Sequence, residues 1–78
     1  MALYAIPAAN GDTVLYVDGW NGWLRIQLNT FGYWTLALRR PGYYTSFTGM
    51  AGHPDVVRSV AETMLRGAAR ADGIEVRA

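Results

Sequence analysis

The first two thirds of the chain contain segments of alternating apolar and polar residues, between turns rich in glycine. Two segments, residues 23–28 and 33–40, alternate over their whole length, which is the period of a β-strand with one buried face. Other stretches are β-branched and aromatic, which also favours strands. We expect strands at about residues 2–6, 13–18, 23–28, 33–40 and 43–47. The pattern therefore predicts a sheet of three to five strands over about residues 2–47.

The connections between these strands are short, and their residues are typical of turns. Asn10 and Gly11 tolerate positive φ, which indicates a tight turn. The segment Arg40-Pro41-Gly42-Tyr43 fits a type II turn, with proline second and glycine third. Parallel strands would need long crossover connections. The chain has no room for them, so we expect an antiparallel meander.

After residue 53 the apolar period changes to that of an α-helix, predicted over about residues 54–71. Pro54 suits a first helical position, and Gly73 is a plausible stop. The apolar stripe consists of Val57, Val60, Ala61, Met64, Leu65 and Ala68. The polar stripe includes Arg58, Glu62 and Arg66, spaced for ion pairs one turn apart. Residues 48–52 read as a loop, and residues 74–77 have room for a short edge strand.

These elements predict a single α+β domain over residues 1–78, with the helix packed on one sheet face. Such a helix is about 26 Å long and 10 Å wide, so it covers one face of three or four strands. We expect it to cover the face of Leu24, Ile26, Leu28, Trp34, Leu36 and Leu38. The opposite face is then left without a cover. A register error of one residue would exchange the two faces.

Aromatic and arginine side chains gather on the face that the helix leaves open. Tryptophan, tyrosine and arginine are the residues that dominate binding hot spots. The candidate partner-binding residues are Trp20, Trp23, Arg25, Tyr33, Arg39 and Tyr43. Two structural alternatives remain. Trp23 and Tyr33 would stabilise the sheet as cross-strand neighbours, and Trp20 would fold back over the sheet edge. Arg40 is adjacent to Arg39 in the same strand, so its side chain points to the opposite face of the sheet. It should lie there near a helix terminus or a carboxylate.

Composition narrows the function classes. The chain has no cysteine and one histidine, His53, beside the expected start of the helix. Its carboxylates are scattered, so the sequence indicates no catalytic residues, no metal site and no cofactor. We therefore expect a protein that is not an enzyme. No segment is apolar enough for a membrane span, and the first residues lack the basic region of a signal peptide, which favours a soluble, cytoplasmic protein.

The net charge of +1 is small, and all seven basic residues are arginine, which is typical of a GC-rich bacterial or phage coding sequence. We expect a small protein-binding module, an inhibitor or adaptor, that binds a protein partner or a second copy of itself through the open face. One alternative is a DNA-binding domain that uses a three-stranded sheet, although such domains usually carry more positive charge. Another is a structural virion or scaffold component.

Overall fold

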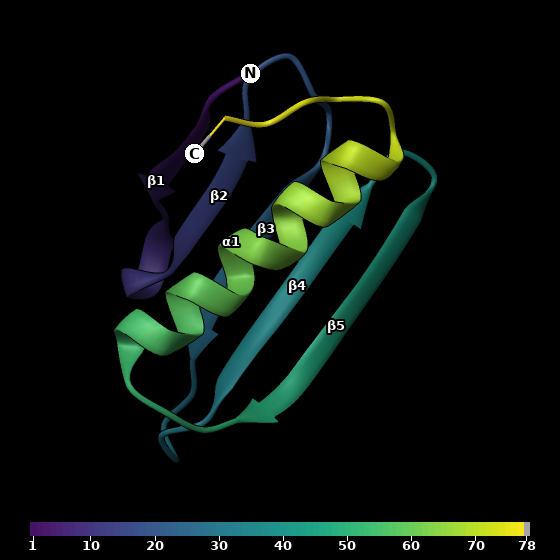
Figure 1. Ribbon diagram of the computed structural model, residues 1–78. Helices are drawn as coiled ribbons and strands as arrows, with labels where there is room; N and C mark the ends of the chain where they lie inside the picture. The colour runs from purple at the N-terminus through teal and green to yellow at the C-terminus, as the bar shows by residue number, and fades with distance from the viewer. Residues whose placement is uncertain (78) are drawn as a thin grey trace.

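A computed structural model describes residues 1–77 of the chain as a five-stranded antiparallel sheet with one helix on one of its faces (Figure 1). The strands lie in the sheet in the order in which they follow one another in the chain. The elements are β1 (Leu3–Pro7), η1 (Ala9–Gly11), β2 (Thr13–Val17), β3 (Trp23–Leu28), β4 (Trp34–Arg40), β5 (Tyr43–Met50) and α1 (Pro54–Ala71). The predicted α+β meander with a C-terminal helix is confirmed.

Positive backbone φ angles occur at the predicted turns. Asn10 and Gly11 have φ of 63° and 77° within η1, which links β1 to β2. Gly42 has φ of 76°, as the third position of a type II turn requires. Glycine reaches these angles without a Cβ clash, so the sequence sets these reversals locally.

The boundaries of β4, β5 and the C-terminal segment differ from those predicted, and β1 and the end of β2 differ by one residue. β5 runs to Met50 instead of ending at Phe47, because Gly49, with φ of 99°, forms a bulge that lets pairing with β4 continue. The loop that follows is therefore limited to residues 51–53. Tyr33 lies in the turn before β4 and outside the strand. Residues 74–77 form no strand and make only a single parallel bridge, between Arg77 and Ala2.

The core lies between α1 and the predicted sheet face. Its fully buried side chains come from α1 and the three central strands: Leu15, Leu24, Leu36, Leu65, Val17 and Val57. Trp34 packs against this core, and its indole nitrogen donates to the carbonyl oxygen of Gly52 at 3.2 Å. Leu28, also expected under the helix, is exposed at the end of β3. The assignment of the covered face is otherwise correct.

Both ends of α1 use residues that the sequence singled out. His53 is the N-cap, and its Nδ1 accepts a hydrogen bond from the backbone nitrogen of Asp55 at 3.2 Å. At the other end, the backbone nitrogens of Gly73 and Ile74 donate to the carbonyls of Arg70 and Ala69, which is a Schellman motif. The predicted ion pairs of Glu62 with Arg58 and Arg66 are present, at 2.8 and 3.5 Å.

Asp72 fastens the C-terminal end of α1 to the sheet. One of its carboxylate oxygens accepts from Arg40 at 2.7 Å, and the other accepts from the indole nitrogen of Trp20 at 2.9 Å. Arg40 ends β4, and Trp20 lies in the connection between β2 and β3. Arg40 therefore lies beside a carboxylate at a helix terminus, as the sequence predicted.

We expect the stability of the fold to depend on the ionisation of Asp72. The hydrogen bond from Arg40, and then that from Trp20, holds the pKa of Asp72 below its ordinary value of 3.8. A carboxyl whose pKa is lower in the folded state stabilises the fold above its unfolded pKa. That contribution is lost as the pH falls through the folded pKa. Urea unfolding of wild type and Asp72→Asn between about pH 6 and pH 2 should show a smaller acid loss in the variant. Equal acid losses would contradict the prediction.

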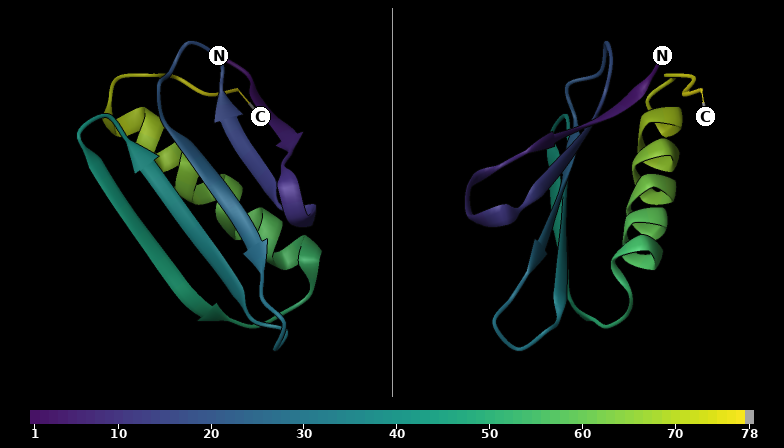
Figure 2. Two further views of the ribbon diagram at one scale, coloured as in Figure 1. Left: turned by 180° about the vertical axis from the view of Figure 1, so that it is seen from behind. Right: turned by 90° about the vertical axis from the view of Figure 1, so that its left-hand side faces the viewer.

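The helix leaves most of the last strand uncovered. It packs mainly against β2, β3 and β4, and β5 lies to one side of it (Figure 1), with Met50 at its end packed against the core. The edge-on view in Figure 2 shows the helix alone on one side of the sheet and no element on the other side. Both the far face of the sheet and most of β5 are thus left uncovered, which confirms that one helix is too narrow for this sheet.

Candidate protein-binding face

A row of large side chains crosses the uncovered sheet face from one edge strand to the other. Strand register sets Tyr4 opposite Tyr16, Tyr16 opposite Trp23, Trp23 opposite Arg39, and Arg39 opposite Tyr44. Paired residues of antiparallel strands point to the same face, so these five side chains form one line. We call these five residues the aromatic row.

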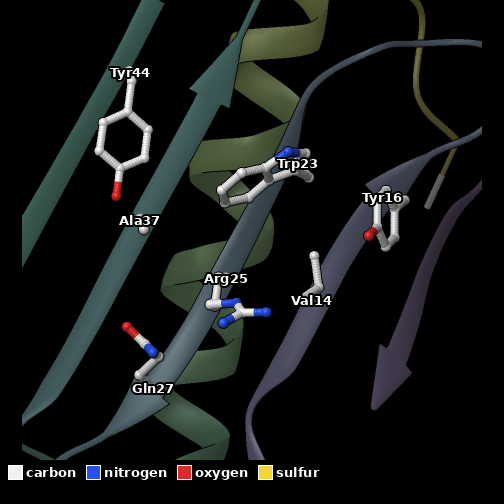
Figure 3. A pocket seen from close by; sticks show the side chains of 7 residues that line it. All are labelled: Val14, Tyr16, Trp23, Arg25, Gln27, Ala37 and Tyr44. Carbon is white, nitrogen blue, oxygen red and sulfur yellow. The ribbon is translucent and has the colours of Figure 1, made fainter. Parts of the chain in front are cut away.

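The rings of the aromatic row interact with one another. Tyr4 and Tyr16 stack with their centroids 5.5 Å apart. Trp23 and Tyr44 meet edge to face at 6.4 Å, although β4 lies between their strands. Figure 3 shows the indole of Trp23 extending toward β4, on which Ala37 lies, with Tyr44 on the strand beyond it. Two ring contacts are thus present within the row in the chain by itself.

A hollow of about 280 Å³ lies beside the row, lined by Val14, Tyr16, Trp23, Arg25, Gln27, Ala37 and Tyr44 (Figure 3). Its two smallest lining side chains are buried although no element covers this face. Val14 is 6% exposed and Ala37 is 5% exposed, because the larger side chains beside them exclude solvent. The open face is therefore a shallow apolar depression with aromatic and polar walls, and the sequence had indicated only an uncovered surface.

The two arginines of the face differ in their electrostatic surroundings. Arg25 lies 3.5 Å from the carboxylate of Asp12, which is itself 8% exposed and also accepts from Gln27 at 3.0 Å. Arg39 is exposed and forms no ion pair within residues 1–77. The face therefore offers one free guanidinium, that of Arg39, next to the rings of Trp23 and Tyr44.

The structure brings together three of the six candidate partner-binding residues, Trp23, Arg25 and Arg39. Trp20 lies apart from them, on the helix side, where it packs against the core and binds Asp72. This is the alternative in which Trp20 folds back over the sheet. Tyr33 lies in the turn before β4 and is 48% exposed, so it is not a cross-strand neighbour of Trp23.

Tyr43 lies on the opposite face from the one expected. It is paired with Arg40, whose side chain reaches the helix end, and the adjacent Tyr44 occupies the open face instead. The error is one of parity. The run Tyr43 to Phe47 has no clean alternation of apolar and polar side chains, so its sequence does not reveal which tyrosine faces the helix.

Sequence reasoning missed Tyr4, Tyr16 and Tyr44. A signal for Tyr16 was present, because Tyr16 lies between the aliphatic Leu15 and Val17 in one strand and must point to the face opposite theirs. The parity of that strand follows once Leu15 is assigned to the core. Tyr4 then follows from its pairing with Tyr16, whereas Tyr44 required the register of β5.

Matching the chain against protein-family models, curated proteins and solved structures found no related protein. Over residues 1–77, no three or more histidine, aspartate or glutamate side chains lie close enough together to hold a metal ion. Neither helix in residues 1–77 is both long enough and apolar enough to span a bilayer.

Proposed function

We propose that this chain is a small protein-binding module without enzymatic activity, and that its partner docks on the open sheet face. The observation that carries the proposal is the aromatic row together with the hollow beside it. Tryptophan, tyrosine and arginine are enriched at the energetic centre of protein interfaces. Here they form one surface that no other part of the described chain covers.

The shape of the face supports a partner that inserts an apolar side chain. The hollow has buried apolar residues in its lining and preordered rings at its margin. Preordered side chains lose little entropy on binding, which favours affinity. Arg39, exposed beside the hollow, is suited to a carboxylate at the edge of the same contact. An acidic residue next to an apolar one is therefore the chemistry that we expect on the partner.

The charge on the face favours a protein over DNA. Affinity for nucleic acid comes mainly from arginine and lysine contacts with phosphates. Arg25 is offset by Asp12, and Arg39 is the sole arginine of the face without an ion pair within residues 1–77. We propose, within this reading, an inhibitor or adaptor of a larger bacterial or phage assembly, because all seven basic residues are arginine and a domain of 78 residues has little room for a substrate cleft.

Replacement of Trp23 by alanine should abolish capture of the partner while the domain stays folded. Truncation of a central aromatic anchor costs about 2 kcal/mol or more, which is roughly thirtyfold in affinity. Wild type and variant, each used as bait in a lysate of the native host, would be compared by mass spectrometry. Phe31→Ala is the matched control, because Phe31 is 85% exposed in the turn before β4. Equal capture by all three baits would contradict the proposed face.

A gel shift with random duplex DNA tests the alternative partner. At low salt, where phosphate contacts are strongest, we expect no shift at micromolar protein. A shift that disappears with Arg39→Ala and at high salt would favour the DNA-binding reading over the protein-binding one.

A further inference from the structure

The outer edge of β5 carries backbone groups without partners. β5 is the last strand of the sheet and pairs only with β4. Every second residue of such a strand points its N–H and C=O away from the sheet. Within residues 1–77, no other segment donates to or accepts from these groups. Figure 1 shows no element beyond β5 on that side.

The other edge of the sheet is protected, and β5 is not. β1 has five residues and ends at Pro7, which has no N–H to donate. At its other end, Ala2 bridges Arg77, and the backbone nitrogen of Arg77 donates to Met1 at 2.8 Å. β5 has eight residues with no charge and no proline, and its one irregularity, at Gly49, lies near its end. Charges and proline are the usual protection of an exposed edge.

Apolar side chains project from both faces of β5. Tyr44, on the open face, is 55% exposed. Tyr43 and Phe47, on the helix side but beyond the reach of α1, are 54% and 52% exposed. A strand added to this edge would therefore gain backbone hydrogen bonds and also cover apolar surface on both faces of the sheet.

We propose that the occupant of this edge is the β5 strand of a second copy of the chain, paired antiparallel about a two-fold axis at Ser46. Two identical antiparallel strands are complementary by symmetry. Because β5 has no charged residue, the pairing opposes no like charges, and a net charge of +1 per chain repels a second copy only weakly.

Parity allows an axis at any residue of the strand, and Ser46 is the one residue that is central both in the whole strand, Tyr43–Met50, and in its regular part, Tyr43–Thr48. Antiparallel partners must point to the same face, so each residue faces one of equal parity in the other copy. With the axis at Ser46, Ser46 faces its own copy, Tyr44 faces Thr48, and Thr45 faces Phe47, all within the regular part of β5. An axis perpendicular to the sheet keeps both helices on one side. Both aromatic rows then remain uncovered on the other side, so this inference does not rest on the proposed function.

Two variants that place opposite charges at position 46 test the pairing. We expect wild type to sediment as a dimer at about 100 μM. Ser46→Lys and Ser46→Glu should each weaken self-association about tenfold or more, because like charges meet at the axis. High salt should partly restore the Ser46→Lys dimer by screening. An equimolar mixture should form a one-to-one heterodimer, which native mass spectrometry resolves by mass.

The controls separate this edge from other interfaces. Thr63→Lys adds the same charge at an exposed position of α1 and should leave the dimer intact. Circular dichroism would establish that each variant is folded. A monomeric wild type, a Ser46→Lys variant that associates as wild type does, or a mixture without heterodimer would each overturn the proposal. Loss of the dimer in Trp23→Ala would instead place the contact on the open face and also overturn it.

Discussion

Gly22→Ala should destabilise the domain by about 2–3 kcal/mol, the cost of forcing extra atoms into packed structure. A Cβ at this position would overlap the indole ring of Trp20 and would lie 2.6 Å from the carbonyl oxygen of Arg39. The carbonyl belongs to the backbone of β4, so relief of that contact requires the backbone at residue 22 to shift, and the indole of Trp20 must be displaced as well. Trp20 would then lose its hydrogen bond to Asp72 at the end of α1. Thermal unfolding should show a midpoint lower by roughly 10–20 °C.

Gly67→Ala is the matched control for this experiment. Gly67 lies on the exposed side of α1, and a Cβ there would meet nothing within 4 Å. The same substitution should therefore stabilise the domain, by about 0.5–1 kcal/mol, because alanine restricts the unfolded chain and favours helix. Equal losses of stability in the two variants would mean that the fold does not depend on the close packing of Trp20 and the Arg39 carbonyl against Gly22.

Leu24→Ala should destabilise the domain far more than Trp23→Ala, although the two residues are adjacent in β3. Leu24 is fully buried between the sheet and α1, and truncation of such a leucine costs about 2–5 kcal/mol. A domain of this size has only about 4–12 kcal/mol in total. Trp23 points to the open face, where loss of its contact with Tyr44 should cost below about 1.5 kcal/mol.

Urea unfolding of the two variants measures both free energies directly. Asn21→Ala, in the exposed connection before β3, is a reference for a substitution with little effect. A larger loss for Trp23→Ala than for Leu24→Ala would mean that the faces of β3 are exchanged. That result would remove the aromatic row as a binding surface and leave the edge of β5 unaffected.

The sheet and the helix could be predicted because their local signals agree with the fold. Residues 23–28 alternate cleanly, and Leu24 and Ile26 belong to the core as expected. Pro54 and Gly73 mark the ends of α1 within a residue or two. Arg40 was placed near a carboxylate by parity alone, since it had to point to the side opposite Arg39. In each case neighbours in sequence decide the structure.

The prediction errors occur where contacts with distant parts of the chain determine the position of a side chain. β5 lacks alternation, so the faces of Tyr43 and Tyr44 depend on pairing with β4. Trp20 follows β2 and yet bonds Asp72, which lies 52 residues later in the chain. The hollow of the open face depends on the ring contact between Trp23 of β3 and Tyr44 of β5, which lie on opposite sides of β4. No local pattern reports such contacts, and they form much of the candidate site.

Every strand of this sheet pairs only with its neighbours in the chain. Contacts close in sequence need only short loops to close, and proteins dominated by them fold quickly. Successive hairpins can therefore form before the long-range contacts, which are the docking of the helix and the bridge between Ala2 and Arg77. The strands are then unpaired for only a short time during folding. This limits the time in which an exposed edge such as that of β5 can pair with other unfolded chains and aggregate.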